Sequence, residues 1–504
     1  MQPATSAPDT DSAPSPAARS AHRIRIAEGL KRILPAESVI AQEEPLRAYE
    51  CDGLSAYRQL PLVAVLPANE AEVQAVMRFA SEHQVPVVAR GSGTGLSGGA
   101  TPHAEGILLS MARFNRILKV DPLARTAVVQ PGVRNLRISE HVAPYNLYYA
   151  PDPSSQIACS IGGNVAENSG GVHCLKYGLT VHNILKLRVV TIDGDVLVIG
   201  SDALDAPGYD LLALMTGSEG LLGVVTEVTV KLTPKPQVAR VVMASFADVE
   251  QAGNAVAAVI GAGIVPAGLE MMDKLATRAV EDFVHAGYDL DAEAILLCES
   301  DGTPEEVEEE IAKISAVMRD AGATDIRVSH DEAERLKFWS GRKAAFPAVG
   351  RISADYYCMD GSIPRRELAH VLKRTAQLSE HYGLACANVF HAGDGNLHPL
   401  ILFDGNKPGE LERAEQFGAD LLELCIEVGG TITGEHGVGI EKINQMCSQF
   451  RPAELERFHA VKAAFDARTL LNPGKAVPLL HRCAEYGAMR VTSGKLPFAD
   501  IPRF

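Results

Sequence analysis

Four side chains that could bind a metal ion or move a proton lie in two short stretches of the C-terminal half. The stretch NVFHAGDGNLHPLILF (388–403) holds His391 and His398 on either side of Asp394-Gly395, a dipeptide that favours a two-residue hairpin turn. That turn would pair residue 391 with residue 398. The two side chains would then have Cβ atoms roughly 5 Å apart. Such a spacing suits two imidazole ligands of one divalent metal ion such as zinc, or a role in binding substrate.

The stretch GGTITGEHGVGIEK (429–442) places Glu435 and His436 between glycines. Adjacent residues of an extended segment point to opposite faces, so these two side chains should not ligate the same ion. We expect Glu435 to be a metal ligand and His436 to face the substrate. The alternative is a polar turn without a chemical role. Only a fold that brings residues 391, 398 and 435 together decides between the two.

A stretch rich in basic residues, RLKFWSGRKAAFPAVGRISADYYCMDGSIPRR (335–366), indicates a site for an anion. It carries seven arginines and lysines against two aspartates, in a chain whose net charge is −16. Arg342, beside the only tryptophan, is the best candidate for a carboxylate clamp, because a guanidinium matches carboxylate geometry. The acidic balance of the whole chain argues against a nucleic-acid partner.

The glycine-rich stretch RGSGTGLSGG (90–99) is a candidate phosphate site. Its glycines spell G-x-G-x-x-G, the pattern of a dinucleotide-binding βαβ unit. The expected strand–helix–strand unit, with Asn69 as helix N-cap, ends at Ala89, and Pro102 and Gly106 leave no room for the long helix that must follow the glycines. The loop is therefore expected either to bind phosphate through a concavity of backbone N–H groups or to be merely flexible.

The elements that must position these residues belong to a chain of 504 residues, long enough for at least two domains. Residues 1–23, rich in Pro, Ala and Ser, are predicted to be a disordered tail and not a signal peptide. The longest apolar stretch, 255–269, is too short for a membrane span and is interpreted as a helix followed by a strand. The nine cysteines form no C-x-x-C, which argues against an iron–sulfur cluster. Without a disulfide pattern or a secretion signal, we expect a cytoplasmic protein.

Three further stretches complete a recognisable pattern: YAPDPSSQIACSIGGNVAENSGG (149–171), KYGLT (176–180) and TGSEGLLGVVTEVTVKL (216–232). With them the chain, from about residue 24 to 478, resembles the FAD-linked 2-hydroxyacid dehydrogenases of the vanillyl-alcohol oxidase / p-cresol methylhydroxylase flavoprotein family. The resemblance implies an α+β fold, in which a two-part FAD-binding domain joins an α+β substrate (cap) domain. The expected divisions are a tail (1–23), a helical segment (24–58), the FAD-binding domain (59–236), the cap domain (237–430), a segment returning to the flavin (431–478) and a C-terminal tail (479–504).

The resemblance also implies how FAD is held. The first glycine loop would cradle the pyrophosphate and the later segments would line the ribityl chain and the isoalloxazine. That loop contains no histidine, so non-covalent binding is expected. The residues expected to bind FAD are Arg90, Gly91, Ser92, Gly93, Thr94, Gly95, Leu96, Ser97, Gly98, Pro151, Asp152, Ser155, Gly162, Gly163, Ala166, Asn168, Gly170, Gly171, Tyr177, Gly178, Glu219, Gly223, Val224 and Asn472.

Family members of this type also share the motifs H-A-G-D-G-N-x-H and G-E-H-G, both present here. The resemblance implies metal ligation by His391, His398 and Glu435, with His436 as the catalytic base. The stretches YECDGLSAYR (49–58), 338–366 and LHRCAEYGAM (480–489) are similar to those of members that oxidise glycolate as large subunits of a complex. The stretch YYCMD (356–360) lacks the further basic residue that a second substrate carboxylate would need, which favours a monocarboxylate.

The activity implied is oxidation of a small 2-hydroxy acid, glycolate to glyoxylate, with hydride transfer to FAD. The partners implied are a second flavin-binding subunit and an iron–sulfur subunit, through which the complex would touch the inner face of the membrane. The alternative is a D-lactate (or other D-2-hydroxyacid) dehydrogenase acting alone. Two other classes remain open: a metal-dependent hydrolase with structural glycines, and a flavin-bearing carrier. The tail 479–504 either docks onto a partner or packs on its own domain.

Overall fold

The N-terminal part of the computed structural model is a helix followed by short turns; the model describes residues 16–203, 208–479 and 483. Helix α1 (Pro16–Leu30) begins within the stretch expected to be a disordered tail, so that expectation is wrong for residues 16–23. The helix forms because Ile26, Ala27 and Leu30 share one face, which is buried against the first sheet. The short elements that follow are η1 (Ala36–Ser38), α2 (Glu43–Leu46) and η2 (Arg47–Tyr49).

A four-stranded sheet in the order β1-β2-β4-β3 carries the first glycine loop. Its strands are β1 (Val39–Ile40), β2 (Val63–Val65), β3 (Val87–Arg90) and β4 (Ile107–Ser110), and helix α3 (Glu70–His83) connects β2 to β3. The side chain of Asn69 accepts a hydrogen bond from Glu72 N, which confirms the predicted N-cap. No helix lies between β3 and β4, so the glycines do not belong to a dinucleotide-binding βαβ unit.

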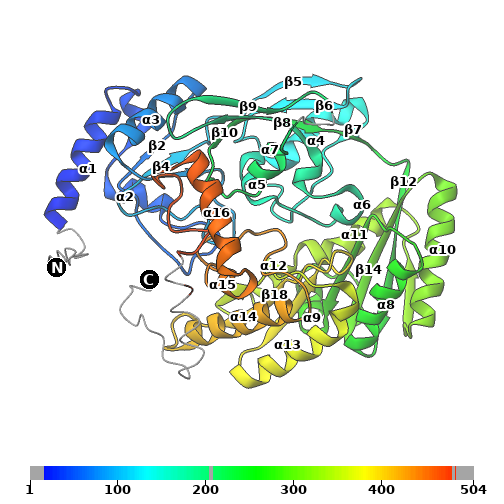
Figure 1. Ribbon diagram of the computed structural model, residues 1–504. Coiled ribbons are helices and arrows are strands. Elements are labelled where there is room, and N and C mark those ends of the chain that lie inside the picture. Colours follow the sequence, from blue (N-terminus) through cyan, green and yellow to red (C-terminus); the bar gives the residue numbers. More distant parts are fainter. Residues whose placement is uncertain (1–15, 204–207, 480–482, 484–504) are drawn as a thin grey trace.

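A five-stranded antiparallel sheet in the order β5-β6-β10-β8-β9 completes the upper lobe (Figure 1). Its strands are β5 (Ile117–Asp121), β6 (Thr126–Val129), β8 (Ile184–Val190), β9 (Val196–Gly200) and β10 (Val224–Lys231); β7 (Leu147–Tyr148) pairs with β11 (Thr233–Pro234). The connecting helices are α4 (Asn135–Val142), η3 (Ala143–Tyr145), α5 (Ile161–Glu167), α6 (Cys174–Tyr177), η4 (Thr180–Asn183) and α7 (Leu211–Met215).

The lower lobe is built on a seven-stranded antiparallel sheet in the order β15-β12-β14-β13-β17-β18-β16. Its strands are β12 (Val238–Phe246), β13 (Gly268–Asp273), β14 (Ala294–Gly302), β15 (Asp325–Val328), β16 (Asp355–Cys358), β17 (Cys386–Phe390) and β18 (Pro399–Phe403). The apolar stretch 255–269 is the end of a helix and the start of β13, as predicted.

Helices cover both faces of this sheet because its strands are apolar on both sides. Along β12, Val242 and Ala244 enter one core and Val241 and Met243 enter the other. The first core is covered by α8 (Val249–Gly261), α10 (Pro304–Asp320), α13 (Leu368–Tyr382) and α14 (Glu410–Glu427), with η5 (Arg365–Glu367) beside them. The second is covered by α9 (Lys274–Val284), α11 (Glu332–Lys343) and α12 (Ala345–Val349), and it also takes in Val172 of the upper lobe.

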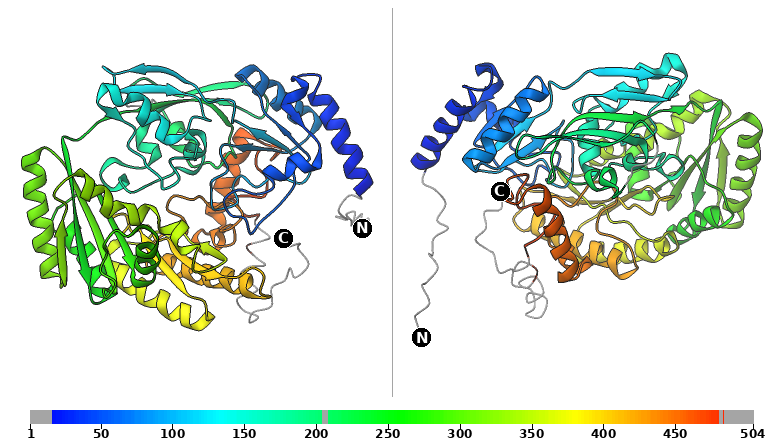
Figure 2. Two further views of the ribbon diagram at one scale, coloured as in Figure 1. Left: turned by 180° about the vertical axis from the view of Figure 1, so that it is seen from behind. Right: turned by 45° about the horizontal axis from the view of Figure 1, so that its top comes forward.

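The C-terminal segment returns to the upper lobe, and Figure 2 shows it from two further sides as the orange ribbon between the lobes. After α15 (Met446–Gln449), helix α16 (Pro452–Phe465) packs Val461 and Phe465 against the core of the five-stranded sheet. Leu471 then forms a bridge to Val87 of β3. The segment thus ends beside the strand that leads into the glycine loop.

A disulfide joins Cys447 of α15 to Cys483, with an S–S distance of 2.06 Å. The sequence analysis found no disulfide pattern among the cysteines and did not predict this pair. The two cysteines are 36 residues apart and share no motif, so their proximity follows only from the tertiary fold. Apart from Cys483, the tail from residue 480 lies outside the described residues. Among the helices that the structure describes, none is both long and apolar enough to cross a membrane.

Candidate active site

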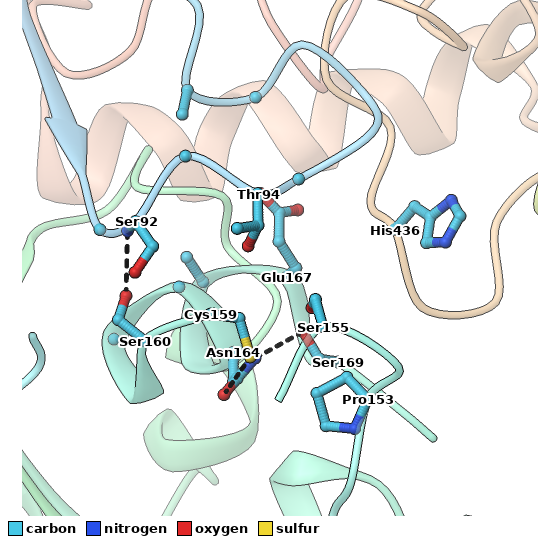
Figure 3. A pocket seen from close by; sticks show the side chains of 18 of the residues that line it. Ser92, Thr94, Pro153, Ser155, Cys159, Ser160, Asn164, Glu167, Ser169 and His436 are labelled. Carbon is cyan, nitrogen blue, oxygen red and sulfur yellow. Dashed lines mark hydrogen bonds between the residues drawn. The ribbon is translucent and has the colours of Figure 1, made fainter. Parts of the chain in front are cut away.

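A cavity of about 380 Å³ lies between the two lobes. Its upper wall is the glycine loop after β3 and the segment around α5; its lower wall comes from α11, α12, β16 and the 433–439 loop. Figure 3 shows Ser92, Thr94 and the end of the Glu167 side chain near one another, Ser155 and Asn164 below them, and His436 apart from them on a separate loop.

The glycine loop leaves room for a ligand because its glycines have no side chains to fill the space. A Cβ on Gly91 would collide with Ser160 Oγ, which accepts a hydrogen bond from Ser92 N at 3.2 Å. Gly93 has a φ of +70°, a left-handed conformation that glycine adopts without strain. A Cβ at that position would also collide with the guanidinium of Arg90. The loop therefore presents backbone and a buried cation, which suits a diphosphate.

Most of the residues predicted to bind FAD line this cavity. They are Arg90, Gly91, Ser92, Gly93, Thr94, Gly95, Leu96, Ser155, Gly162, Gly163, Ala166, Glu219, Gly223 and Val224. Lining residues that the sequence analysis did not name include Met111, Pro131, Cys159, Asn164, Glu167, Lys343, Phe346 and Tyr356. Hydrophobic residues such as Met111 and Phe346 carry no motif, so only the fold shows that they belong here.

The other predicted FAD residues do not line the cavity, and two of them, Ser97 and Asn472, support its walls. The residues that do not line it are Ser97, Gly98, Pro151, Asp152, Asn168, Gly170, Gly171, Tyr177, Gly178 and Asn472. Ser97 O, for example, accepts hydrogen bonds from the backbone of Ile440 and Glu441. Asn472 Nδ2 donates to Gly99 O at 3.0 Å and to Glu219 O at 2.8 Å. These contacts join the C-terminal segment to the glycine loop.

Because the glycine loop has no space for a side chain at position 91, we expect Gly91→Val to weaken FAD binding by at least about tenfold. The new side chain would displace Ser160 and occupy the concavity. The measurement is FAD titration of apoprotein by flavin fluorescence. Gly261→Ala is the matched control, since a Cβ at that position meets nothing within 4 Å. Wild-type affinity in Gly91→Val would contradict this location of the diphosphate.

Of the two histidines of the first motif, His398 lines the lower end of the cavity and His391 lies against it. Their rings are 5.0 Å apart between centroids, and Nε2 of each lies 3.2 Å from Glu435 Oε1. Both are buried, with 3% of each residue exposed. One ligand atom from each of the three residues falls within 4.8 Å of the others. Two imidazoles and one carboxylate form a donor set that fits a divalent ion such as zinc with an open position.

The predicted register of the histidine hairpin is wrong by two residues. Asn388 pairs with Pro399, and His391 bridges Asn396 instead of His398. The turn is longer than predicted, because Asp394 N and Gly395 N both donate to His391 O. A shift of two residues equals the side-chain period of a strand, so both histidines stay on one face and still meet.

A buried carboxylate orients the first of these histidines. Glu270 of β13 lies 2.8 Å from His391 Nδ1, and its other oxygen accepts a hydrogen bond from Arg342 Nε at 2.7 Å. Burial disfavours the charged imidazole, but Glu270 and Glu435 outweigh it and raise the pKa of His391 to about 10. A carboxylate behind a histidine is the usual arrangement that fixes a metal ligand's tautomer and orientation. Nothing in the local sequence around Glu270 signals this role.

Arg342 is not the free clamp that the sequence analysis predicted. It is 1% exposed and does not line the cavity, and its Nε donates a hydrogen bond to Glu270. Its Nη2 atom is nevertheless buried without a hydrogen-bond partner. The next residue, Lys343, does line the cavity and is exposed. The lower wall thus holds one accessible cation, Lys343, whose neighbour on α11 is the buried Arg342.

His436 lines the cavity and belongs to the loop that carries Glu435. Its ring stacks on His398 with centroids 4.9 Å apart, and its Nδ1 is buried without a hydrogen-bond partner. Burial lowers the pKa of His436 to about 4. The imidazole is therefore neutral near pH 7 and can accept a proton. Glu435 contacts the two histidines, and both Glu435 and His436 line the cavity, so the division of roles between them stays a prediction.

The fold and the cavity together define a flavoprotein oxidoreductase of two lobes, and comparison with known proteins agrees. Residues 61–200 match the model of an FAD binding domain, and residues 235–476 match that of FAD linked oxidases, C-terminal domain. The structure is similar to p-cresol methylhydroxylase with substrate bound, with a TM-score of 0.77 at 17% identity over 92% of this chain and 98% of that one.

Sequence comparison identifies relatives within this family that share more of the sequence. The chain is 64% identical over 482 residues to the glycolate oxidase subunit GlcD of Escherichia coli K12, covering 96% of this chain and 97% of that protein. It is 40% identical to GlcD of Bacillus subtilis over 85% of this chain and 91% of that one. It is 34% identical to a D-lactate dehydrogenase of Archaeoglobus fulgidus over 82% and 91%. The chain belongs to the FAD-linked oxidases and binds FAD, which rules out the hydrolase alternative.

Proposed function

We propose that this chain oxidises glycolate to glyoxylate. The observation that carries the proposal is the position of His436, a neutral base at the end of the FAD cavity and beside the histidine–carboxylate cluster. The relatives named above as glycolate oxidase subunits support glycolate as the substrate. The relative named D-lactate dehydrogenase makes D-lactate the second candidate.

The substrate carboxylate is proposed to meet the cations of the lower wall. Lys343 lines the cavity, and Arg342 offers a buried Nη2 atom that has no other partner. A carboxylate bound between them would satisfy that atom, and a charge-assisted hydrogen bond of this kind is strong. The α-hydroxyl would then lie toward His436. Arg342 also holds Glu270, so it acts on both the substrate and the orientation of His391.

His436 is proposed to take the hydroxyl proton as the substrate is oxidised. The imidazole is neutral and has a buried nitrogen free to accept it. FAD, when bound, supplies the acceptor for the hydride that leaves Cα. A divalent ion held by His391, His398 and Glu435 would supply a Lewis acid that lowers the pKa of the hydroxyl. Loss of one proton and one hydride converts glycolate to glyoxylate.

Electrons are proposed to leave through partner subunits, a second flavin-binding chain and an iron–sulfur protein. Two lines of support are the word subunit in the names of the relatives and the lack of any C-x-x-C in this sequence. Membrane contact would then be peripheral and made by the complex.

The function is tested with purified protein, an artificial dye as electron acceptor, and a chemical assay for glyoxylate. We expect dye reduction with glycolate, a lower kcat/KM with D-lactate, and one glyoxylate formed per two electrons. Glycolamide, which lacks the carboxylate, should not be oxidised because the two cations have no anion to bind. A higher kcat/KM for D-lactate would reverse the assignment of substrate.

A further inference from the structure

The loop 433–439 carries the two most important side chains of the site but has no helix or strand of its own. Glu435 must face His391 and His398 while its neighbour His436 faces the cavity. Loops without regular structure are usually mobile, and a shift of about 1 Å at a catalytic group can cost about 100-fold in rate. Something outside the loop must therefore hold its backbone.

Asp360 holds the first half of the loop from the lower lobe. Three consecutive backbone N–H groups donate to its carboxylate: Gly434 N at 3.1 Å, Glu435 N at 3.1 Å and His436 N at 2.9 Å. Asp360 is 0% exposed and follows β16 closely along the chain. The loop backbone is thus wrapped around one buried anion, which fixes the direction of each side chain in turn.

Side chains occupy the remaining acceptor positions of Asp360. Thr433 Oγ1 donates to it at 2.6 Å, Asn396 Nδ2 at 2.9 Å and Lys442 Nζ at 3.0 Å. An oxygen of Asp360 also falls within 4.8 Å of nitrogen atoms of His398 and His436, a group that could in principle hold a metal. Because six donors already saturate the carboxylate, it has no lone pair to spare for an ion. Asp360 therefore holds the loop by hydrogen bonds and is not a metal ligand.

Glu219 holds the second half of the loop from the upper lobe. Its Oε1 accepts a hydrogen bond from Val438 N and its Oε2 one from Gly439 N, both at 2.7 Å. Glu219 lines the FAD cavity and its own backbone is fixed, since Glu219 N donates to Ala166 O. The lower lobe thus holds one end of the loop through Asp360, and the upper lobe holds the other end through Glu219.

We propose that Asp360 and Glu219 are a pair of positioning residues that set the geometry of Glu435 and His436. Both act through the loop backbone, although Glu219 also lines the cavity and Asp360 Oδ1 lies 3.6 Å from His398 Nε2. Asp360 aligns Glu435 with the two histidines, and Glu219 ties the same loop to the wall of the FAD cavity. The part that concerns substrate oxidation rests on the proposed function; the part that concerns metal binding does not.

The test uses purified full-length holoprotein carrying Asp360→Asn, with Asp273→Asn as the matched control. The substituted side chain presents an amide N–H to donors that need an acceptor, so the loop loses its anchor. We expect zinc affinity of metal-free protein to fall by about 10- to 100-fold. The rate constant of flavin reduction by glycolate should fall by about 100-fold or more, while the FAD content stays at one per chain. Asp273 also accepts two backbone N–H groups, from Ala276 and Asn388, but lies outside the loop.

A milder variant keeps the test decisive if the Asp360→Asn protein does not fold. Thr433→Val removes one donor to Asp360 together with the contacts of the same hydroxyl to Gly437 O and Lys442 Nζ, and we expect a loss of about three- to tenfold in zinc affinity and in reduction rate. Glu219→Gln should lower the reduction rate with a smaller effect on zinc affinity, because it holds the far end of the loop. Asp273→Asn should lower only the melting temperature.

The proposal is overturned if folded Asp360→Asn or Thr433→Val protein has wild-type zinc affinity and a wild-type reduction rate. It is equally overturned if Asp273→Asn reproduces their losses, since the effect would then be general destabilisation. If wild-type flavin is not reduced by glycolate, the proposed function fails, and the zinc affinities of the same variants still decide whether the loop is held in this way.

Discussion

Replacing His436 by alanine lowers the rate constant of flavin reduction by glycolate by at least about 1,000-fold, while FAD remains bound. The expectation follows from three observations on this residue. It faces the cavity, its Nδ1 has no hydrogen-bond partner, and burial keeps it neutral with a pKa of about 4. Among the described residues, the only other imidazole that lines the cavity is that of His398, whose Nε2 lies 3.2 Å from Glu435.

The measurement is stopped-flow absorbance of the flavin under anaerobic conditions, together with the FAD content of the variant. His381→Ala is the matched control, because His381 lies on α13 at the outer side of the lower lobe (Figure 1). The control should keep the wild-type rate. A His436→Ala protein that is reduced at the wild-type rate would exclude this residue as the base.

Replacing Glu435 by glutamine removes the carboxylate that contacts both histidines, and zinc affinity should fall by at least about 100-fold. The physical reason is electrostatic. Glu435 and Glu270 surround two imidazoles in a buried site, and the negative charge of Glu435 compensates an ion there. Despite its burial, His391 and His398 hold the pKa of Glu435 well below its usual range, so it is charged and ready to ligate.

The measurement is zinc titration of metal-free protein by calorimetry, followed by the rate of flavin reduction with and without the ion. Glu454→Gln, at the first turn of α16, is a control carboxylate that contacts Arg451 at the protein surface. Chelation of the wild type should lower the rate to that of Glu435→Gln, and added zinc should restore only the wild type. A wild-type protein that binds no divalent ion would contradict the role assigned to the cluster.

The sequence was most informative where local chemistry decides structure. The helix cap at Asn69 and the exclusion of a dinucleotide fold at the glycine loop both depend on residues within a few positions of each other, and both are confirmed. The proximity of the two histidines was predicted although the register was wrong by two residues. That error was harmless because a strand repeats its side-chain direction every second residue.

The sequence was least informative where contacts join distant segments. Arg342 was chosen for its charge, but Glu270, 72 positions earlier, takes its Nε. Asp360 was only one of two acids in a basic stretch, yet the fold surrounds it with donors from residues 396, 433–436 and 442. The disulfide between Cys447 and Cys483 is of the same kind. Such pairs have no spacing rule, so no local pattern could have indicated them.

The most direct test of the proposed function is anaerobic mixing of the purified chain with glycolate, D-lactate and D-2-hydroxyglutarate in turn, following the absorbance of the flavin. We expect a yellow protein that glycolate bleaches fastest and that D-lactate bleaches more slowly. D-2-hydroxyglutarate should leave the flavin unchanged, because the lower wall, in the part of the chain that the structure describes, offers no further cation for a second carboxylate. A yellow protein loaded with zinc that glycolate does not bleach would contradict the proposed function and would make this chain a carrier of electrons.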